Sequence, residues 1–232
     1  METEFGPKVI IEFSNGLVIT ETVINTWIIM AILIIGSLIL VRNFQRIPKG
    51  AQNFTEMLVD TVYKLTEQGM GKGKLGFAPY VGTLLIYLVF ANLWGLTGFR
   101  PPTSDVNTTF ALAIITFFMI HFFGFKSSGL GYLKGFAEPI PFMLPLNIIS
   151  ELATPVSLAF RLFGNIVGGL IIMHLLYGAL ISLSGAIGLS IPVFQAGVPL
   201  VQHVYFDVFA GVLQSFIFVM LTMVFVSMAM DE

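Results

Sequence analysis

The sequence predicts an all-α integral membrane protein with about five membrane-embedded helices, the last two forming a long C-terminal hairpin, and with amphipathic surface helices in addition. Hydrophobic residues make up 56% of the 232 residues, charged residues make up 10%, and there are 23 phenylalanines, more apolar surface than a soluble domain can bury. Several uncharged stretches are long enough to cross a bilayer. The net charge of -2 means that basic residues are not in excess, as they would be in a nucleic-acid-binding protein. The chain has no cysteine for disulfides or thiolate sites.

The first three crossings follow from uncharged stretches. Thr22 to Val41 has no formal charge over 20 residues, about 30 Å of helix. The acidic N-terminus before it lacks the basic region of a cleavable signal peptide, so we expect this helix to be retained. Leu75 to Phe99 and Val106 to Phe125 predict the second and third crossings, and the prolines and polar residues from Arg100 to Asp105 favour a break between them.

The last two crossings form the predicted hairpin. Leu162 to Phe206 contains no Asp, Glu, Lys or Arg over 45 residues, which is too long for a single crossing. Glycine, serine and proline between Ser182 and Pro199 favour a turn, and the last helix is expected to run to about Met230. We expect one membrane domain, 1–232, with an N-terminal region at 1–74, the second and third crossings at 75–140, and the hairpin region at 141–232.

The distribution of Lys and Arg predicts the orientation, because these residues accumulate in cytoplasmic loops. Most of them lie in the segments that follow the first and third crossings: Arg42, Arg46, Lys49, Lys64, Lys72, Lys74, Lys126 and Lys134. Only Lys8 and Arg100 fall on the opposite side. The N-terminus is therefore expected outside, and the C-terminal Asp231-Glu232 in the cytoplasm.

An amphipathic helix is predicted in the segment after the first crossing. Its apolar stripe has helical spacing and consists of Phe54, Leu58, Val62 and Leu65. Acidic and basic residues occupy the opposite side, as expected of a helix that lies in the membrane interface.

Arg161 is the most informative residue, because it is the only Lys or Arg after Lys134 and lies deep in apolar sequence. An arginine at bilayer depth costs about 3 kcal/mol on insertion scales, so its presence calls for a partner, a water-filled cavity or a function. The guanidinium stays charged and has five donors but no acceptor. It suits a gate that holds a carboxylate better than a proton relay.

A polar stripe is predicted around this arginine. Steps of three and four place the stripe on one helical face: Thr154, Ser157, Arg161 and Asn165, with Gly164 and Gly168 beside them. The two glycines fit close packing between membrane helices equally well. Together with a central arginine, they favour a face that accommodates the side chains of a partner.

A second polar stripe is predicted in the last helix. Asp207 and Gln214 are seven residues apart and so share a face, with Gly211 between them and His203 one turn before Asp207. An aspartate at lipid depth is a candidate stepping-stone for a proton or ion. The alternative is a static Asp207–Arg161 ion pair that holds two helices together.

Glu151 is expected to open the helix that carries Arg161. It is either a partner of the helix dipole or a carboxylate at the entry of an ion path. His121 and His174 are isolated among apolar residues and receive no role. We find no nucleotide-binding or catalytic signature, and we predict no cofactor and no metal site.

Three motifs in the C-terminal half are recognisable as a set. They are Glu151-Leu-Ala-Thr-Pro155-Val-Ser-Leu-Ala-Phe-Arg161-Leu-Phe-Gly-Asn165, Leu213-Gln214-Ser-Phe-Ile-Phe218 and Ser227-Met-Ala. The set resembles subunit a of F-type ATP synthases. The resemblance extends to Pro101–Thr109 and to Phe142–Asn147, which the family carries ahead of its arginine helix, and covers most of the chain from about position 75.

The resemblance implies a stator subunit in a bacterial-type inner (plasma) membrane. Two long tilted helices would lie against a ring of c subunits, with two offset aqueous half-channels that carry H⁺ or Na⁺. Its partners would be the c-ring, the peripheral-stalk b subunits and the rest of the ATP synthase, whose catalytic sites lie on other subunits. Arg161 matches the essential arginine, Asn165 and Gln214 match its polar neighbours, and Glu151 matches an access-path carboxylate.

Two positions depart from the family pattern. Leu170 stands where many members carry glutamate, and Asp207 stands where several carry histidine or glutamate. We infer that Asp207 and Glu151 carry more of the polarity of the access paths in this chain.

Two other functions stay open on the residues alone. A secondary ion-coupled transporter also places charges at mid-membrane, but it favours two comparable halves, and we see no such repeat. A purely structural membrane subunit would use Arg161 only to pair with Asp207, and it predicts that exchanging the two residues preserves activity.

Overall fold

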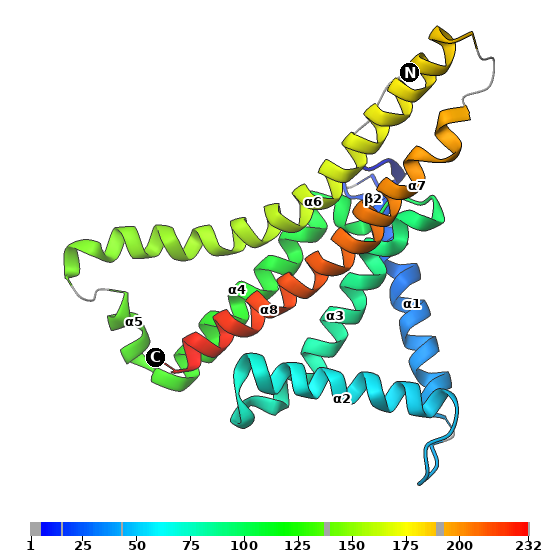
Figure 1. Ribbon diagram of the computed structural model, residues 1–232. Coiled ribbons are helices and arrows are strands. Elements are labelled where there is room, and N and C mark those ends of the chain that lie inside the picture. Colours follow the sequence, from blue (N-terminus) through cyan, green and yellow to red (C-terminus); the bar gives the residue numbers. More distant parts are fainter. Residues whose placement is uncertain (1–5, 15, 43, 137–139, 189–192, 232) are drawn as a thin grey trace.

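The computed structural model describes residues 6–14, 16–42, 44–136, 140–188 and 193–231 (Figure 1). Within these ranges, five helical segments are long and apolar enough to cross a membrane: Glu21–Val41, Lys72–Thr97, Val106–Ser128, Leu144–Ala186 and Val198–Asp231. The all-α membrane class and the five predicted crossings are therefore confirmed. Residues 189–192 of the predicted hairpin turn lie outside the described residues.

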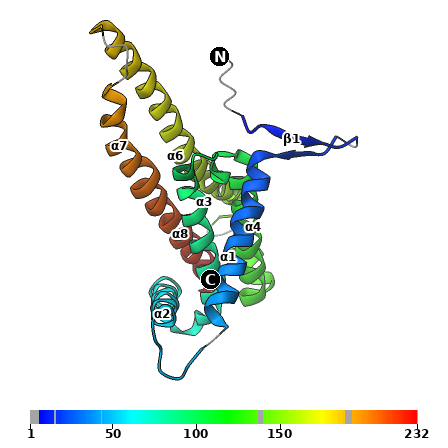
Figure 2. The same cartoon turned by 90° about the vertical axis from the view of Figure 1, so that its right-hand side faces the viewer.

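A short β-hairpin precedes the first crossing, and the sequence analysis did not predict it. Strand β1 (Val9–Glu12) pairs antiparallel with β2 (Val18–Thr20). The strands are rich in valine and isoleucine, whose branched side chains favour extended backbone. Helix α1 (Glu21–Val41) follows directly, and Figure 2 shows the hairpin projecting away from the helices.

The predicted surface helix is α2 (Ala51–Met70), which lies across the lower ends of the crossing helices in Figure 1. Val62 is buried against α3 (Ala78–Leu93), where a Cβ on Gly82 would lie 3.1 Å from the Val62 Cγ1. Phe54 is 60% exposed, so only the later part of the apolar stripe packs on this chain. The 3-10 turn η1 (Lys72–Phe77) joins the two helices.

The break between the second and third crossings is built from two 3-10 turns, η2 (Trp94–Thr97) and η3 (Pro102–Ser104). Asp105 caps α4 (Val106–Ser128) by accepting a hydrogen bond from the Asn107 backbone N–H at 2.9 Å. The same carboxylate accepts one from the Thr22 hydroxyl at 2.7 Å. A single buried aspartate therefore ties the start of α1 to the start of α4.

The arginine-bearing helix is longer than the sequence suggested. After α5 (Leu130–Gly135) and the turn η4 (Pro141–Met143), helix α6 runs for 43 residues, Leu144–Ala186, and Figure 1 shows it changing direction along its length. The expectation that Glu151 opens this helix is wrong, and so is the placement of Asn147 ahead of it. Pro145 is accommodated in the first turn, where its missing N–H leaves no helical bond unmade.

The last crossing is not one regular α-helix. Turn η5 (Val193–Ala196) is followed by α7 (Val198–His203), a π-helical segment η6 (Val204–Ala210) and α8 (Gly211–Asp231). A π-helix closes i→i+5 hydrogen bonds and turns more slowly than an α-helix. The inference that Asp207 and Gln214 share a face assumed α-helical spacing throughout, and this premise is wrong for Val204–Ala210.

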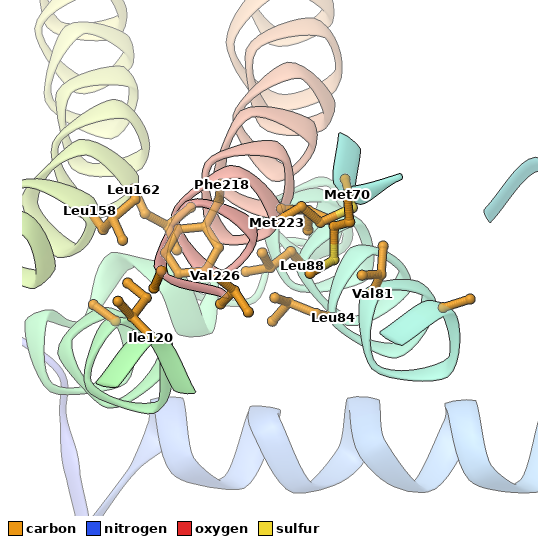
Figure 3. Close-up of a cluster of buried hydrophobic side chains, with 14 of the residues drawn as sticks. Met70, Val81, Leu84, Leu88, Ile120, Leu158, Leu162, Phe218, Met223 and Val226 are labelled. Atoms are coloured by element: carbon orange, nitrogen blue, oxygen red, sulfur yellow. The ribbon is translucent and has the colours of Figure 1, made fainter. Parts of the chain in front are cut away.

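Helix α8 is central to the packing and contacts α2, α3, α4 and α6. Figure 3 shows its Phe218, Met223 and Val226 between side chains of α3 and α6. Phe218 and Met223 are each 1% exposed. The upper part of the hairpin, α6 with α7, extends beyond this core in Figures 1 and 2, so its outer faces are left open by this chain.

Candidate functional site

Arg161 lies on an exposed face of α6. Within the described part of the chain its guanidinium has no hydrogen-bond partner and no ion-pair partner. A cavity of about 190 Å³ adjoins it, lined by Ser150, Ala153, Thr154, Ser157, Leu158, Arg161 and Phe225. Three of these residues bear hydroxyl groups, so a polar wall leads from the Glu151 end of α6 to the arginine.

Gly164 and Gly168 lie beside the arginine on α6 and carry no side chain that would fill the space in front of the helix. A Cβ built on Gly164 or Gly168 would meet no atom of the described residues within 4 Å, whereas a Cβ on Gly169 would lie 3.4 Å from Phe206. Gly169 therefore serves the packing of α6 against the neighbouring helix. Gly164 and Gly168 serve no close packing within the described chain, and the space in front of them is available to another molecule.

The predicted neighbours of the arginine, Asn165 and Gln214, lie at the junction of the two hairpin arms. The Asn165 Nδ2 donates to the Ala210 carbonyl at 3.3 Å, at the point where η6 meets α8. Gln214 is 7% exposed, and its Nε2 is buried with no hydrogen-bond partner among the described residues. An unsatisfied buried amide is costly, which makes Gln214 a polar group available at the helix junction.

Asp207 belongs to a hydrogen-bonded chain of three side chains. Its Oδ2 lies 2.5 Å from the His203 Nδ1, and the His203 Nε2 lies 3.1 Å from the Tyr177 hydroxyl of α6. The Asp207 side chain is 19% exposed and that of His203 is 37% exposed. Sequence reasoning named His203 and Asp207 but missed Tyr177, because the contact crosses the hairpin and leaves no local pattern.

Glu151 belongs to a second cluster, on the other side of Arg161 along α6. Its Oε1 lies 3.8 Å from the Nε2 of His121 on α4, and the His121 Nδ1 lies 2.9 Å from the Tyr132 hydroxyl on α5. His121 is therefore not isolated among apolar residues, which corrects the sequence analysis on this point. The signal available in the sequence was the presence of an ionisable ring in an apolar crossing, which is itself costly.

The static pair between Arg161 and Asp207 is not found. Both residues are described, and the ion pair that Asp207 makes is with His203. Along the α6 axis, Glu151 lies about 15 Å before Arg161 and Tyr177 about 24 Å after it, at 1.5 Å per residue. The arginine thus stands between two polar clusters that are displaced in opposite directions along the helix.

Comparison with known proteins gives the family. A family model described as "ATP synthase A chain" matches residues 23–227. The chain is 38% identical over 211 residues to ATP synthase subunit a of Moorella thermoacetica, covering 90% of each chain. It is 40% identical over 216 residues to ATP synthase subunit a 2 of a Bradyrhizobium species, covering 92% of this chain and 90% of the relative.

A third relative is named for its ion. ATP synthase subunit a, sodium ion specific, of Propionigenium modestum is 36% identical over 228 residues, covering 91% of this chain and 74% of the relative. The match and these identities over most of the chain confirm the resemblance drawn from the arginine-centred motifs. The protein with this arginine between two polar clusters is thus a multi-pass membrane component of an ATP synthase, and the chain belongs to the ATP synthase A chain family.

Proposed function

We propose that this chain is the stator subunit of a rotary ATP synthase, forms two aqueous half-channels against a c-ring, and couples H⁺ or Na⁺ flow to ring rotation and ATP synthesis. The observation that carries the proposal is Arg161, a permanent charge at membrane depth that is exposed and unpaired in the described chain. Such a charge requires an anionic partner from another subunit, and a c-ring carboxylate supplies one.

The mechanism follows from the cost of charge in lipid. A ring carboxylate that has bound an ion is neutral and can face the bilayer, whereas the ionised carboxylate is too costly to expose and is held near Arg161. The arginine cannot deprotonate, so it blocks direct leakage between the half-channels. One charge moved through the membrane potential gains about 2.3 kcal/mol per 100 mV, which is exported as torque.

The two polar clusters suit the two half-channels. Glu151 and the hydroxyl-lined cavity beside Arg161 would serve one side. Asp207, His203 and Tyr177 would serve the other, with Asn165 and Gln214 at the junction. Leu170, exposed on α6, adds no polar group to either route, so this chain depends more on Asp207 and Glu151.

The chain would work only as part of a larger membrane complex. The catalytic nucleotide sites would lie on other subunits, so this chain is not an enzyme alone. The peripheral-stalk b subunits would bind it as well, and a largely apolar cavity of about 790 Å³ among α1, α3 and α4 is open to an apolar helix. The bacterial inner membrane, with the N-terminus outside and the C-terminus cytoplasmic, fits the Lys and Arg distribution.

The test is ATP-driven ion pumping by the reconstituted complex, with H⁺ and Na⁺ monitored in parallel. Arg161→Ala should abolish pumping while the subunits remain assembled, and the wild type should show which ion is coupled. Arg42→Ala, which removes an exposed arginine just after α1, is the matched control and should pump normally. Normal pumping by a fully assembled complex that carries Arg161→Ala would contradict the proposal.

A further inference from the structure

His121 joins three helices through its two ring nitrogens. The Nδ1 faces the Tyr132 hydroxyl at 2.9 Å, and the Nε2 faces the Glu151 carboxylate at 3.8 Å. The side chains of His121 and Glu151 are each 29% exposed, whereas Tyr132 is 7% exposed. The imidazole therefore lies between a buried hydroxyl and a partly exposed carboxylate, near the end of α4 that carries Lys126.

The site of Tyr132 is shaped to hold its ring close to α4. A Cβ on Gly124 would lie 2.6 Å from the Tyr132 Cε2, a distance that real Cβ atoms essentially never show. Glycine at this position lets the phenol approach the helix one turn after His121. Phe117 and Phe136 also flank the imidazole, with ring centroids at 4.1 and 6.4 Å. The ring is thus held on several sides, with its Nε2 toward Glu151.

We propose that His121 is a proton-transferring residue that exchanges protons between Glu151 and water at this end of the membrane, and that Tyr132 is the positioning residue for its imidazole. This inference rests on the proposed function and extends it, because it assigns a second ionisable group to the half-channel that contains Glu151. The side concerned is the one that the Lys and Arg distribution predicts to be cytoplasmic.

The proton transfer balances within the cluster. Neutral His121 with its proton on Nδ1 donates to the Tyr132 oxygen and leaves the Nε2 lone pair toward Glu151. A protonated Glu151 then transfers its proton to Nε2, directly or through one bridging water, which gives an imidazolium and a carboxylate. The imidazolium releases the same proton to water, which restores the neutral imidazole, and Glu151 regains its proton from the ring carboxylate that the proposed function brings to this half-channel. In ATP-driven pumping the steps run in reverse.

The side chains that contact the imidazole come from the helices packed against it. Among the described residues with a contact to His121, the ionisable ones are Glu151 from α6 and Tyr132 from α5, and the other contacts are aromatic rings. Imidazole is the side chain whose charge changes between about pH 5 and 8. A complex that uses it should therefore depend on pH in this range on the Glu151 side.

The experiment measures ATP-driven proton pumping by the whole reconstituted complex while the pH on the Glu151 side is varied from about 5 to 8. The rate of His121→Gln is divided by the wild-type rate at each pH, which cancels the pH dependence of the catalytic subunits. Glutamine keeps a polar side chain of similar size but cannot titrate. His174→Gln is the matched control, since His174 is an exposed histidine of α6 outside both clusters.

The expected result is a ratio that falls as the pH rises and reaches a loss of about tenfold or more where free protons are scarce, while His174→Gln stays near the wild type. A pH-independent ratio would show that His121 only holds the helices together and would overturn the proposal. Should His121→Gln fail to assemble, Tyr132→Phe gives the answer, because it removes only a hydroxyl. It should show a weaker pH-dependent loss, and a flat ratio would overturn the proposal.

The outcomes separate this inference from the function on which it rests. Loss of pumping in Arg161→Ala together with a pH-independent His121→Gln ratio would contradict proton transfer by His121 and would leave the proposed function supported. Pumping of Na⁺ without H⁺ would do the same. Normal pumping in Arg161→Ala would remove the proposed function itself, whatever His121→Gln does.

Discussion

Asn92 and Arg161 are polar residues of two helical segments that are long and apolar enough to cross a membrane, and their surroundings are opposite. Asn92 lies on α3, faces α8 and is 2% exposed. Its Oδ1 accepts a hydrogen bond from the Thr103 hydroxyl at 2.7 Å, and its Nδ2 donates to the Gly211 carbonyl at 2.9 Å and to the Ser215 hydroxyl at 2.8 Å. Arg161 has five donors on an exposed face, and no described residue of the chain accepts from them.

The difference distinguishes a polar residue that stabilises the fold from one that serves function. A buried polar group that is fully hydrogen-bonded inside the chain fixes how its helices pack. A charged group with no partner inside the chain is too costly at membrane depth to serve packing alone. The Asn92 network therefore builds the scaffold, and the Arg161 face is the part that another subunit must complete.

The largest expected effect comes from exchanging the two charges, Arg161→Asp together with Asp207→Arg. Because the two residues make no ion pair, the exchange moves the arginine away from the open face and should lower ion pumping by more than about 100-fold. Pumping by the reconstituted complex measures this. Activity of the double variant close to the wild type would instead support a structural pair and would remove the contrast between the two regions.

Asn92→Leu tests the scaffold side. It leaves the hydrogen-bonding groups of Thr103, Gly211 and Ser215 without this partner, and we expect a loss of about 2–4 kcal/mol in stability. The measurement is thermal unfolding of the purified complex in detergent. Asn165→Leu is the matched comparison, since it removes one 3.3 Å bond and should lower stability less but pumping more. The reverse order would contradict the assignment of the two regions.

Two glycines, Gly124 and Gly164, differ in what surrounds them. Gly124→Ala places a Cβ 2.6 Å from Tyr132 and should destabilise the isolated chain by about 1–3 kcal/mol. The added Cβ of Gly164→Ala meets no described residue within 4 Å, and alanine is a better helix former than glycine, so the isolated chain should be no less stable. Pumping should nevertheless fall in Gly164→Ala if a partner approaches that face. Unchanged pumping would mean that the face stays uncovered in the complex.

The smallest effect is expected on the surface helix. The Lys64 ammonium donates a hydrogen bond to the Asp60 carboxylate at 2.7 Å, and this bond raises the pKa of Lys64. A raised lysine pKa contributes stability below the ordinary lysine pKa and loses it as the pH rises through the higher folded value. Both side chains are more than half exposed, so Lys64→Ala should leave the melting temperature unchanged within error from pH 6 to pH 9. A clear drop would show that α2 depends on this pair.

Much of the fold and of the Arg161 face was predictable because the relevant signals are local. The length of an uncharged run decides whether a segment crosses the bilayer, and the five predicted crossings are all present. The cost of one arginine at lipid depth identified the central residue of the candidate site. The three-and-four spacing placed Ser157 on the side of Arg161, and both line the same cavity.

The class, the crossings and the position of the central arginine could be read from the sequence, since hydropathy and helical period are properties of neighbouring residues. Which ionisable groups meet depends on how the helices pack: His121 contacts Glu151, and Tyr177 contacts His203. These contacts join separate helices, so no spacing along the chain encodes them. The π-helical segment Val204–Ala210 also appears only in the fold, because it changes the helical period that the sequence argument assumed.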